Sequence, residues 1–464
     1  MSKIVVKFYY GRPPSHSGRH ILLLLHVGID DTDSPRGGCT TYIASRLVQE
    51  LLGLGAVFVD YPNLLRLNPN VPWKTRGNGA VCLRAEIDTG LEGPVKRAVV
   101  EAVEARADFE CADTNPGIVF YVGEVSENLR RFSEGVVQGV VTIGEAMKLV
   151  DEHQASAVGY KNMRGVIGAL AAVGGLKGGD HTFELLAYRR PENCGSPRLI
   201  DQESVKAMDE DTRGSTFSNI DPETGRVLLA PHGPDPVLFG VRGETPEAVY
   251  EAAKMVEPGE PIERWAIFRT NQGTDAHLRS LSKLCELRPY HPAVVDGKVS
   301  RKPVTIKGGH VILGLRDETG QIDCAAYEPT GGFRKLVRLL IQGDRIRAFG
   351  GVREASAYRP ETLNLEKMEV LSLAHIVRLV NPSCPACGAT MESMGKGKGF
   401  RCRRCGLRDG RLMKQKVEAK RSLKPGLYIP PPRAHRHLTK PMERYGREKR
   451  EYRPEGLFEP WHRP

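Results

Sequence analysis

Four cysteines constrain the fold of this chain more than any other feature of its sequence. Cys384 and Cys387 form one Cys-X-X-Cys turn, and Cys402 and Cys405 form a second, with 14 residues between the two turns. Each turn offers two thiolates to a single zinc ion, which binds four ligands tetrahedrally. Because four cysteines leave no open coordination position, we expect a structural zinc ribbon over residues 380–410 rather than a catalytic metal site.

The charge of the chain predicts a polyanionic partner. Its formal net charge is +11 at pH 7, and residues 411–464 are expected to form a basic C-terminal tail. A nucleic acid suits such a chain, although a generally basic proteome would give the same excess. Basic side chains also lie between and within the cysteine turns, where they would contact a phosphate backbone or simply form a solvated hairpin. They are Lys396, Lys398, Arg401, Arg403 and Arg404.

A length of 464 residues is too great for one hydrophobic core and predicts several domains. Residues 1–25 are expected to be a disordered leader. Strands and helices alternate over residues 26–285, which favours small α+β units, and residues 142–175 are expected to be mostly helical. Five short strands, with one helix between the third and the fourth, predict an OB-fold barrel over residues 286–375.

The sequence gives no sign of membrane insertion or export. No apolar run reaches the roughly 20 residues needed to span a bilayer. The stretch from Ile21 to Ile29 is interrupted by His26 and ends in Asp30 and Asp31, with no small-residue cleavage site after it. The six cysteines outside the two turns are scattered without pattern, as is typical of reduced thiols. We therefore expect a cytoplasmic protein.

An acidic loop follows the first apolar strand and precedes a helix expected over about residues 41–54. Asp30, Asp31 and Asp33 fall within four residues and would repel one another without a cation, so we expect them to hold Mg²⁺ and a triphosphate. Arg36, Gly37 and Gly38 come next, where glycines let the backbone approach a ligand. Thr40 then lies at the start of the helix, which favours an anion. The alternative is an acidic turn that only caps the helix.

Polar loops elsewhere are candidates for contacts with a nucleotide or a base. Guanidinium and amide groups suit phosphates and base edges, and an exposed polar loop is the alternative for each. No Walker A motif or dinucleotide fingerprint is present, so a nucleotide site would be of a less common kind. The candidates are Arg66, Asn68, Asn70, Lys74, Arg76, Asn78, Asp180 and His181.

These motifs together resemble the archaeal tRNA(Ile) 2-agmatinylcytidine synthetases. The resemblance extends over about residues 26–445 in consistent order. It rests on Gly28–Ser34, Arg66–Asn70, Lys74–Gly77, Asp113–Gly117, Arg164–Leu170, Asp180–Glu184, Pro231–Asp235, Phe268–Gln272, Gly308–Ile312, the two cysteine turns and Pro430–His437.

The resemblance implies a specific activity. Enzymes of this family attach agmatine to the 2-carbon of the wobble cytidine of the isoleucine tRNA with a CAU anticodon, so that AUA is decoded as isoleucine. They cleave ATP to AMP and pyrophosphate and phosphorylate a threonine of their own. Phosphorylation turns the cytosine 2-oxygen into a leaving group that the amine displaces. The implied partners are this tRNA and agmatine, with no obligate protein partner.

The resemblance also implies an architecture and roles for individual residues. A kinase-like α/β catalytic region is expected over residues 26–200 and a ferredoxin-like region over 201–285, ahead of the OB-fold and the zinc ribbon; the boundary between the first two is left open, with interleaved regions as the alternative. The family's phosphorylated threonine follows a glycine-rich turn and a cysteine, which matches Thr40 after Cys39. Its aspartates match those of the acidic loop. No residues are assigned to the agmatine guanidinium.

Two other functions are compatible with parts of the sequence. An OB-fold and a zinc ribbon also occur in non-catalytic nucleic-acid-binding proteins, but the acidic loop is intact here. A nucleotidyl ligase would need an adenylated-lysine motif, and a lysidine-type synthase would need an SGGxDS loop. Neither motif is present.

Overall fold

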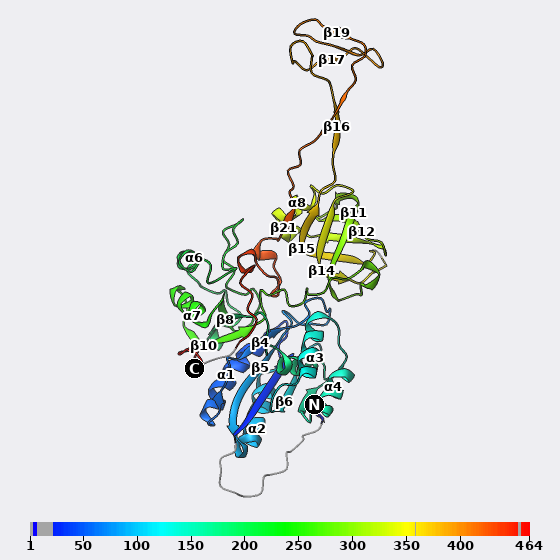
Figure 1. The fold of residues 1–464 in the computed structure, drawn as a ribbon. Coiled ribbons are helices and arrows are strands. Elements are labelled where there is room, and N and C mark those ends of the chain that lie inside the picture. Colours follow the sequence, from blue (N-terminus) through cyan, green and yellow to red (C-terminus); the bar gives the residue numbers. More distant parts are fainter. Residues whose placement is uncertain (1–2, 7–21, 358, 453–455) are drawn as a thin grey trace.

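The computed structural model describes residues 3–6, 22–357, 359–452 and 456–464, with the backbone alone for residues 3–6. The described chain folds into a large body built on one sheet, a β-barrel above it, and a small ribbon that projects from the barrel (Figure 1). No helix of the described residues is long and apolar enough to cross a membrane.

A single 11-stranded sheet forms the large body, in the order β1-β7-β6-β2-β5-β4-β10-β8-β9, with β3 paired to β5 and β22 paired to β10. The pairing of β4 with β10 is parallel and joins the two halves of this sheet. The strands are β1 (Lys3–Val6), β2 (Leu22–Asp30), β3 (Val57–Phe58), β4 (Asn63–Arg66), β5 (Gly79–Asp88), β6 (Gly117–Val122), β7 (Ser156–Tyr160), β8 (Thr182–Arg189), β9 (Val237–Gly243), β10 (Ile262–Thr270) and β22 (His462–Arg463).

Helices cover both faces of this sheet and create two hydrophobic cores. One core contains buried residues of α1 (Thr40–Gly53), α2 (Glu92–Arg106), α6 (Gln202–Asp211) and α7 (Pro246–Met255). The other contains buried residues of α3 (Glu127–Gln138), α4 (Ile143–Glu152) and α5 (Gly165–Gly174). Helix α5 is buried along almost its whole length, as expected for a helix that is apolar on all sides.

The structure differs from the sequence expectations at three places in this body. Residues 156–160, within the stretch expected to be mostly helical, form strand β7 between β1 and β6. Strand β8 (residues 182–189) pairs with β9 and β10, which both follow residue 200. It therefore belongs structurally with the region expected over residues 201–285. Of the expected leader, residues 1–2 and 7–21 lie outside the described residues, whereas Lys3–Val6 pairs with β7 and Leu22 already begins β2.

The barrel confirms the predicted OB-fold. Antiparallel pairings run through β13, β12, β11, β14 and β15, and a parallel pairing of β13 with β15 closes the barrel. Its strands and helix are β11 (Pro292–Thr305), β12 (Val311–Arg316), β13 (Gln321–Ala326), α8 (Gly332–Val337), β14 (Arg345–Arg353) and β15 (Thr362–Ser372). Strand β11 is much longer than the sequence suggested, because its first half also pairs with β14.

The zinc ribbon stands on a two-stranded stalk, well away from the large body (Figure 1). Strand β16 (Val377–Val380) pairs with β20 (Gln415–Glu418) in the stalk. Strands β17 (Glu392–Ser393), β18 (Phe400–Arg401) and β19 (Arg408–Asp409) form the ribbon itself. Met391 and Phe400 pack with the cysteines in its small core.

The predicted basic tail returns from the ribbon and packs on the rest of the molecule. Strand β21 (Gly426–Tyr428) joins the barrel by pairing with β15. Two short 3₁₀ turns follow, at Pro432–Ala434 and Met442–Arg444. Near the end of the chain Trp461 is buried in the core of the large body. The described part of this tail is therefore an integral element of the fold.

Candidate active site

A cavity of about 500 Å³ lies where the two halves of the large sheet meet. Its walls come from the acidic loop, from the polar loop between β4 and β5, from strands β8 and β9, and from the C-terminal segment. The lining side chains with chemical functions are Asp30, Asp31, Asp33, Thr40, Arg66, Asn68, Lys74, Arg76, Asn78, Arg164, Glu184, Asp235, Arg242 and His437.

Asp30 ends the central strand β2 and points under helix α5. A Cβ atom on Gly168 of that helix would lie 1.9 Å from Asp30 Oδ2, so only glycine leaves room for the carboxylate. Burial raises the pKa of Asp30 well above its ordinary value, and the charges of Asp31 and Asp33 add to this effect. Among the described residues Asp30 has no ion-pair partner, which makes it the uncompensated acid of the cavity.

The other two aspartates of the loop are each held by an arginine. Arg164 Nη2 lies 3.1 Å from Asp31 Oδ2, and Arg76 Nε lies 2.7 Å from Asp33 Oδ2. Burial raises the pKa of Asp31 in spite of Arg164. Thr114 Oγ1 donates a 2.7 Å hydrogen bond to the Asp33 carbonyl and so fixes the loop backbone. The three carboxylates therefore face one end of the cavity in a fixed arrangement.

Thr40 is the first residue of helix α1 and lines the same end of the cavity. Its hydroxyl lies 2.9 Å from Thr32 Oγ1. The side chain of the preceding residue, Cys39, makes no capping hydrogen bond to the N–H groups of the first turn of α1. Gly38 has a φ of +76° and its carbonyl accepts a 2.5 Å hydrogen bond from Arg76 Nη2. This geometry presents a helix N-terminus beside the aspartates, which suits an anion.

Several of the polar residues predicted to contact a ligand do line the cavity. Arg66, Lys74 and Arg76 bring positive charge to it, and burial with the nearby Arg436 lowers the pKa of Lys74 to about 8. Asn68 and Asn78 also line it, but their amides are already used. Asn68 Nδ2 donates to the carbonyls of Gly139 and Tyr290, and Asn78 Nδ2 donates to the Asn68 carbonyl.

The remaining predicted residues do not line the cavity. The Arg36 side chain is 63% exposed and pairs with Asp108 at 2.6 Å, while Gly37 and Gly38 contribute the turn that leads to Thr40. Asn70 lies against Gly351 of the barrel. Asp180 pairs with Arg444 at 2.9 Å, and the buried His181 ring packs edge-on against aromatic rings, so both hold the C-terminal segment in place.

Four further charged residues of the cavity, and one histidine, were not among the predicted site residues. Glu184 pairs with Arg242 at 2.9 Å, and Asp235 pairs with Arg76 at 3.1 Å. Burial raises the pKa of Asp235. His437 arrives from the C-terminal segment and Arg164 from the turn before α5. A carboxylate between the apolar residues Phe183 and Leu185 of β8 was the one local signal that pointed to Glu184.

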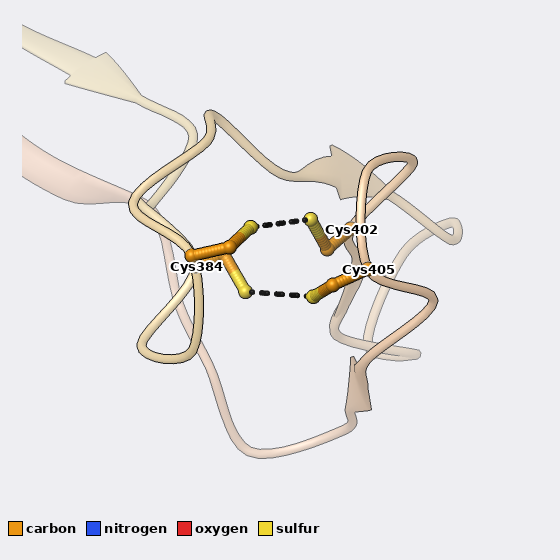
Figure 2. A group of neighbouring side chains, drawn as sticks. Cys384, Cys402 and Cys405 are labelled. Carbon is orange, nitrogen blue, oxygen red and sulfur yellow. Dashed lines mark hydrogen bonds between the residues drawn. The ribbon is translucent and has the colours of Figure 1, made fainter.

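The four cysteines of the ribbon converge as their spacing predicted. Their sulfur atoms all lie within 4.8 Å of one another, with Cys384 Sγ 3.5 Å from Cys405 Sγ and Cys387 Sγ 3.4 Å from Cys402 Sγ. Figure 2 shows the sulfurs pointing inward between the two turns. Four thiolates at this spacing fit one tetrahedral zinc ion.

Models of known protein families match most of the chain between residues 26 and 423. The TiaS TCKD domain matches residues 26–162, the TiaS FLD domain 163–277, an OB-fold nucleic acid binding domain 293–371 and the TiaS C-terminal zinc ribbon domain 381–423. The junction between the first two therefore falls between β7 and α5.

Full-length relatives show the same similarity. The tRNA 2-agmatinylcytidine synthetase TiaS of Methanosarcina mazei, named for an isoleucine tRNA, is 45% identical over 426 residues, which cover 90% of this chain and 97% of the relative. That of Methanocaldococcus jannaschii is 42% identical over 428 residues, which cover 91% and 99%.

Solved structures agree with these relatives. A crystal structure of apo TiaS superimposes with a TM-score of 0.82 at 40% identity, covering 91% of this chain and 97% of the other. A complex of TiaS with its isoleucine tRNA, AMPCPP and agmatine gives 0.78 at 38% identity, with the same coverage. On this combined evidence, the chain belongs to the tRNA 2-agmatinylcytidine synthetase (TiaS) family.

Proposed function

We propose that this protein uses ATP to attach agmatine to the 2-carbon of the wobble cytidine of the isoleucine tRNA with a CAU anticodon. The observation that carries the proposal is the cavity itself, in which an acidic loop, a helix N-terminus and a threonine face several arginines. Relatives that match nearly end to end are named for this reaction, and a similar structure holds an isoleucine tRNA, an ATP analogue and agmatine. The enzyme would act in the cytoplasm, where its tRNA and ATP are available.

The acidic loop would hold ATP and magnesium. Mg²⁺ prefers carboxylate and phosphate oxygens, and Asp30, Asp31 and Asp33 supply three carboxylates at one end of the cavity. Burial and the neighbouring charges of Asp31 and Asp33 raise the pKa of Asp30, and a divalent cation bound there would favour its charged form. The N-terminus of α1 and Arg76 would then face the phosphates. When bound, Mg²⁺ would neutralise phosphate charge.

Thr40 would be the threonine that takes a phosphoryl group. It begins α1 next to the aspartates, and its hydroxyl is positioned by Thr32 Oγ1. A phosphate on Thr40 would lie at the helix N-terminus, where the unpaired N–H groups stabilise negative charge. The arginines of the cavity would stabilise charge on the cytosine 2-oxygen as the agmatine amine displaces it.

Incorporation of radiolabelled agmatine into the CAU tRNA tests this function. We expect ATP-dependent incorporation by the wild type and a loss of at least about a hundredfold in Thr40→Ala and Asp31→Asn, because each removes a group of the cavity wall. Arg36→Ala is the matched control, since Arg36 belongs to the same loop but points to solvent and should leave the rate unchanged. Binding of the tRNA without any incorporation by the wild type would instead favour a nucleic-acid-binding protein without this activity.

A further inference from the structure

The C-terminal segment inserts one side chain, His437, into the cavity. The chain reaches this point only after passing through the barrel, the stalk and the ribbon, so residues far apart in sequence meet here. His437 Nδ1 lies 3.0 Å from Gln272 Oε1, and Gln272 Nε2 donates to Glu184. This chain of contacts ties the ring to the loop after β10 and to strand β8.

The hydrogen-bond chain fixes which ring nitrogen of His437 carries the proton. A carboxylate only accepts, so the amide nitrogen of Gln272 must face Glu184 and its amide oxygen must face His437. That oxygen requires a donor, which places the proton on Nδ1 and leaves a lone pair on Nε2. Arg242 Nη2 is also 3.4 Å from Nδ1, but this contact is longer, and Arg242 already donates to Glu184 through Nε at 2.9 Å.

The surroundings keep the ring in its neutral form. The positive charge of Arg66 lowers the pKa of the solvent-exposed His437 ring well below its usual range, and Arg242 and Lys74 act in the same direction. A neutral ring with its proton on Nδ1 can only accept at Nε2. The ring therefore offers a fixed hydrogen-bond acceptor beside the donors of Arg66 and Lys74, which line the same cavity.

A donor lies beside this acceptor. A Cβ atom on Gly77 would lie 2.9 Å from His437 Nε2 and 3.4 Å from Arg66 Nη1, so the two side chains meet against the Gly77 backbone, and all three residues line the cavity. Arg66 Nη1 donates to the Gly77 carbonyl at 3.1 Å, and its Nη2 makes no hydrogen bond within the described chain. The guanidinium thus keeps donors for a ligand next to an obligate acceptor.

We propose that His437 Nε2 and the Arg66 guanidinium read the Watson–Crick edge of the wobble base and select cytosine over uracil. Cytosine presents an acceptor at N3 beside a donor at its N4 amine, which complements Arg66 and His437. Uracil presents N3–H and O4, the reverse pattern, and would leave both protein groups unpaired. This inference rests on the proposed function, because it assumes that a flipped base enters the cavity.

A chemical double-mutant cycle tests this contact. The two substrates are CAU tRNA with cytidine at the wobble position and the same tRNA with pyrimidin-2-one there, which lacks only the N4 amine. In the wild type we expect the missing amine to lower kcat/KM by about tenfold to a hundredfold, the usual effect of losing one buried hydrogen bond. In His437→Ala the two substrates should differ by less than about twofold, because the partner is already gone.

Two variants separate this effect from damage to the fold. His437→Gln restores an amide oxygen as acceptor and should recover part of the preference for cytidine. His435→Ala perturbs the same segment outside the cavity, where His435 Nε2 contacts the Pro430 carbonyl. It should lower both rates equally and keep the wild-type preference. If removal of the N4 amine lowered kcat/KM by the same factor in the wild type and in His437→Ala, the proposal would be overturned.

Measuring the affinity of both proteins for both tRNAs tests the base contact independently of the reaction. If the wild type incorporates no agmatine into either tRNA, the proposed function fails, whereas affinities for the two tRNAs still report on the contact. A preference for the cytidine tRNA that His437→Ala removes would then support base reading alone. If the wild type and His437→Ala each bound the two tRNAs with equal affinity, base reading by His437 would be refuted.

Discussion

Gly168 determines how closely helix α5 approaches the carboxylate of Asp30. The helix is one of the most deeply buried elements of the molecule, and the carboxylate is confined between it and the end of β2. A charge held in this way has lost most of its water, which is why the pKa of Asp30 is raised. The position and the pKa of Asp30 thus depend on a residue that carries no functional group.

Gly168→Ala should therefore reduce activity far more than stability. The new methyl group would displace Asp30 Oδ2, which lies 1.9 Å from its position, and overpacking of this kind costs about 1–3 kcal/mol of unfolding free energy. Agmatine incorporation and thermal unfolding measured together would show the difference. Gly144→Ala on α4 is the control, because its Cβ would meet nothing closer than 3.8 Å. Full activity in Gly168→Ala would contradict a role for the Asp30 position.

Because of Lys74, the affinity for tRNA should depend on pH in the mildly alkaline range. Burial and Arg436 lower its pKa to about 8, so the amine is charged below that pH and loses its charge above it. Because an anionic ligand binds the charged form better, affinity should fall as the pH rises from about 7 to about 9. Lys74→Arg stays charged throughout and should flatten the profile. The same decline in both proteins would assign the effect to another group.

At the scale of elements, the zinc ribbon is mechanically separate from the reaction cavity. It connects to the barrel through the two strands of the stalk, and its core contains only a few side chains around the cysteines. Such a small core cannot fold without its metal, since a structural zinc site supplies most of the folding energy. A substitution that unfolds the ribbon should therefore leave the barrel and the large body folded.

Cys402→Ser should unfold the ribbon, weaken tRNA binding by about tenfold or more through the loss of its basic surface, and leave ATP binding unchanged. Zinc content, filter binding of the CAU tRNA and ATP affinity would measure the three effects. Cys285→Ser, at an exposed cysteine outside the ribbon, is the matched control. Normal tRNA affinity in Cys402→Ser would show that the ribbon makes no contact with the tRNA.

The whole molecule combines a net charge of +11 with an OB-fold and a ribbon that carries arginines and lysines. Binding of a tRNA should accordingly release counterions from the phosphate backbone. Between about 50 and about 200 mM salt the affinity should fall by about a thousandfold or more if six or more phosphates are contacted. A titration of affinity against salt gives the slope directly, and a flat response would exclude a binding surface dominated by charge.

The sequence predicted those elements that depend on residues close together in the chain. The cysteine turns, the acidic loop and the start of α1 near Thr40 all follow from spacing, charge or apolar periodicity. Strand β7 was missed because five residues flanked by helices carry little periodicity of their own. A strand of this kind is stabilised mainly by its neighbours β1 and β6.

The candidate site was harder to predict because its members come from distant segments. Asp180 lies just before strand β8 and Glu184 lies within it, yet Asp180 pairs with Arg444 and Glu184 lines the cavity. The difference arises because the C-terminal segment places Arg444 beside Asp180. The local sequence around Asp180 and Glu184 does not predict where that segment packs. His437 was missed for the same reason, although the motif containing it was recognised in the sequence.

The unbroken sheet of the large body has a consequence for how such a protein can be altered by recombination. Strand β4 pairs directly with β10, and the last described strand, β22, returns to β10 from the other end of the chain. Exchange of either half with an unrelated protein would expose a row of backbone hydrogen-bond groups at the junction. The ribbon, in contrast, begins and ends in two adjacent strands and can be grafted or replaced as a cassette. Replacement of the ribbon would therefore leave the sheet of the large body unbroken.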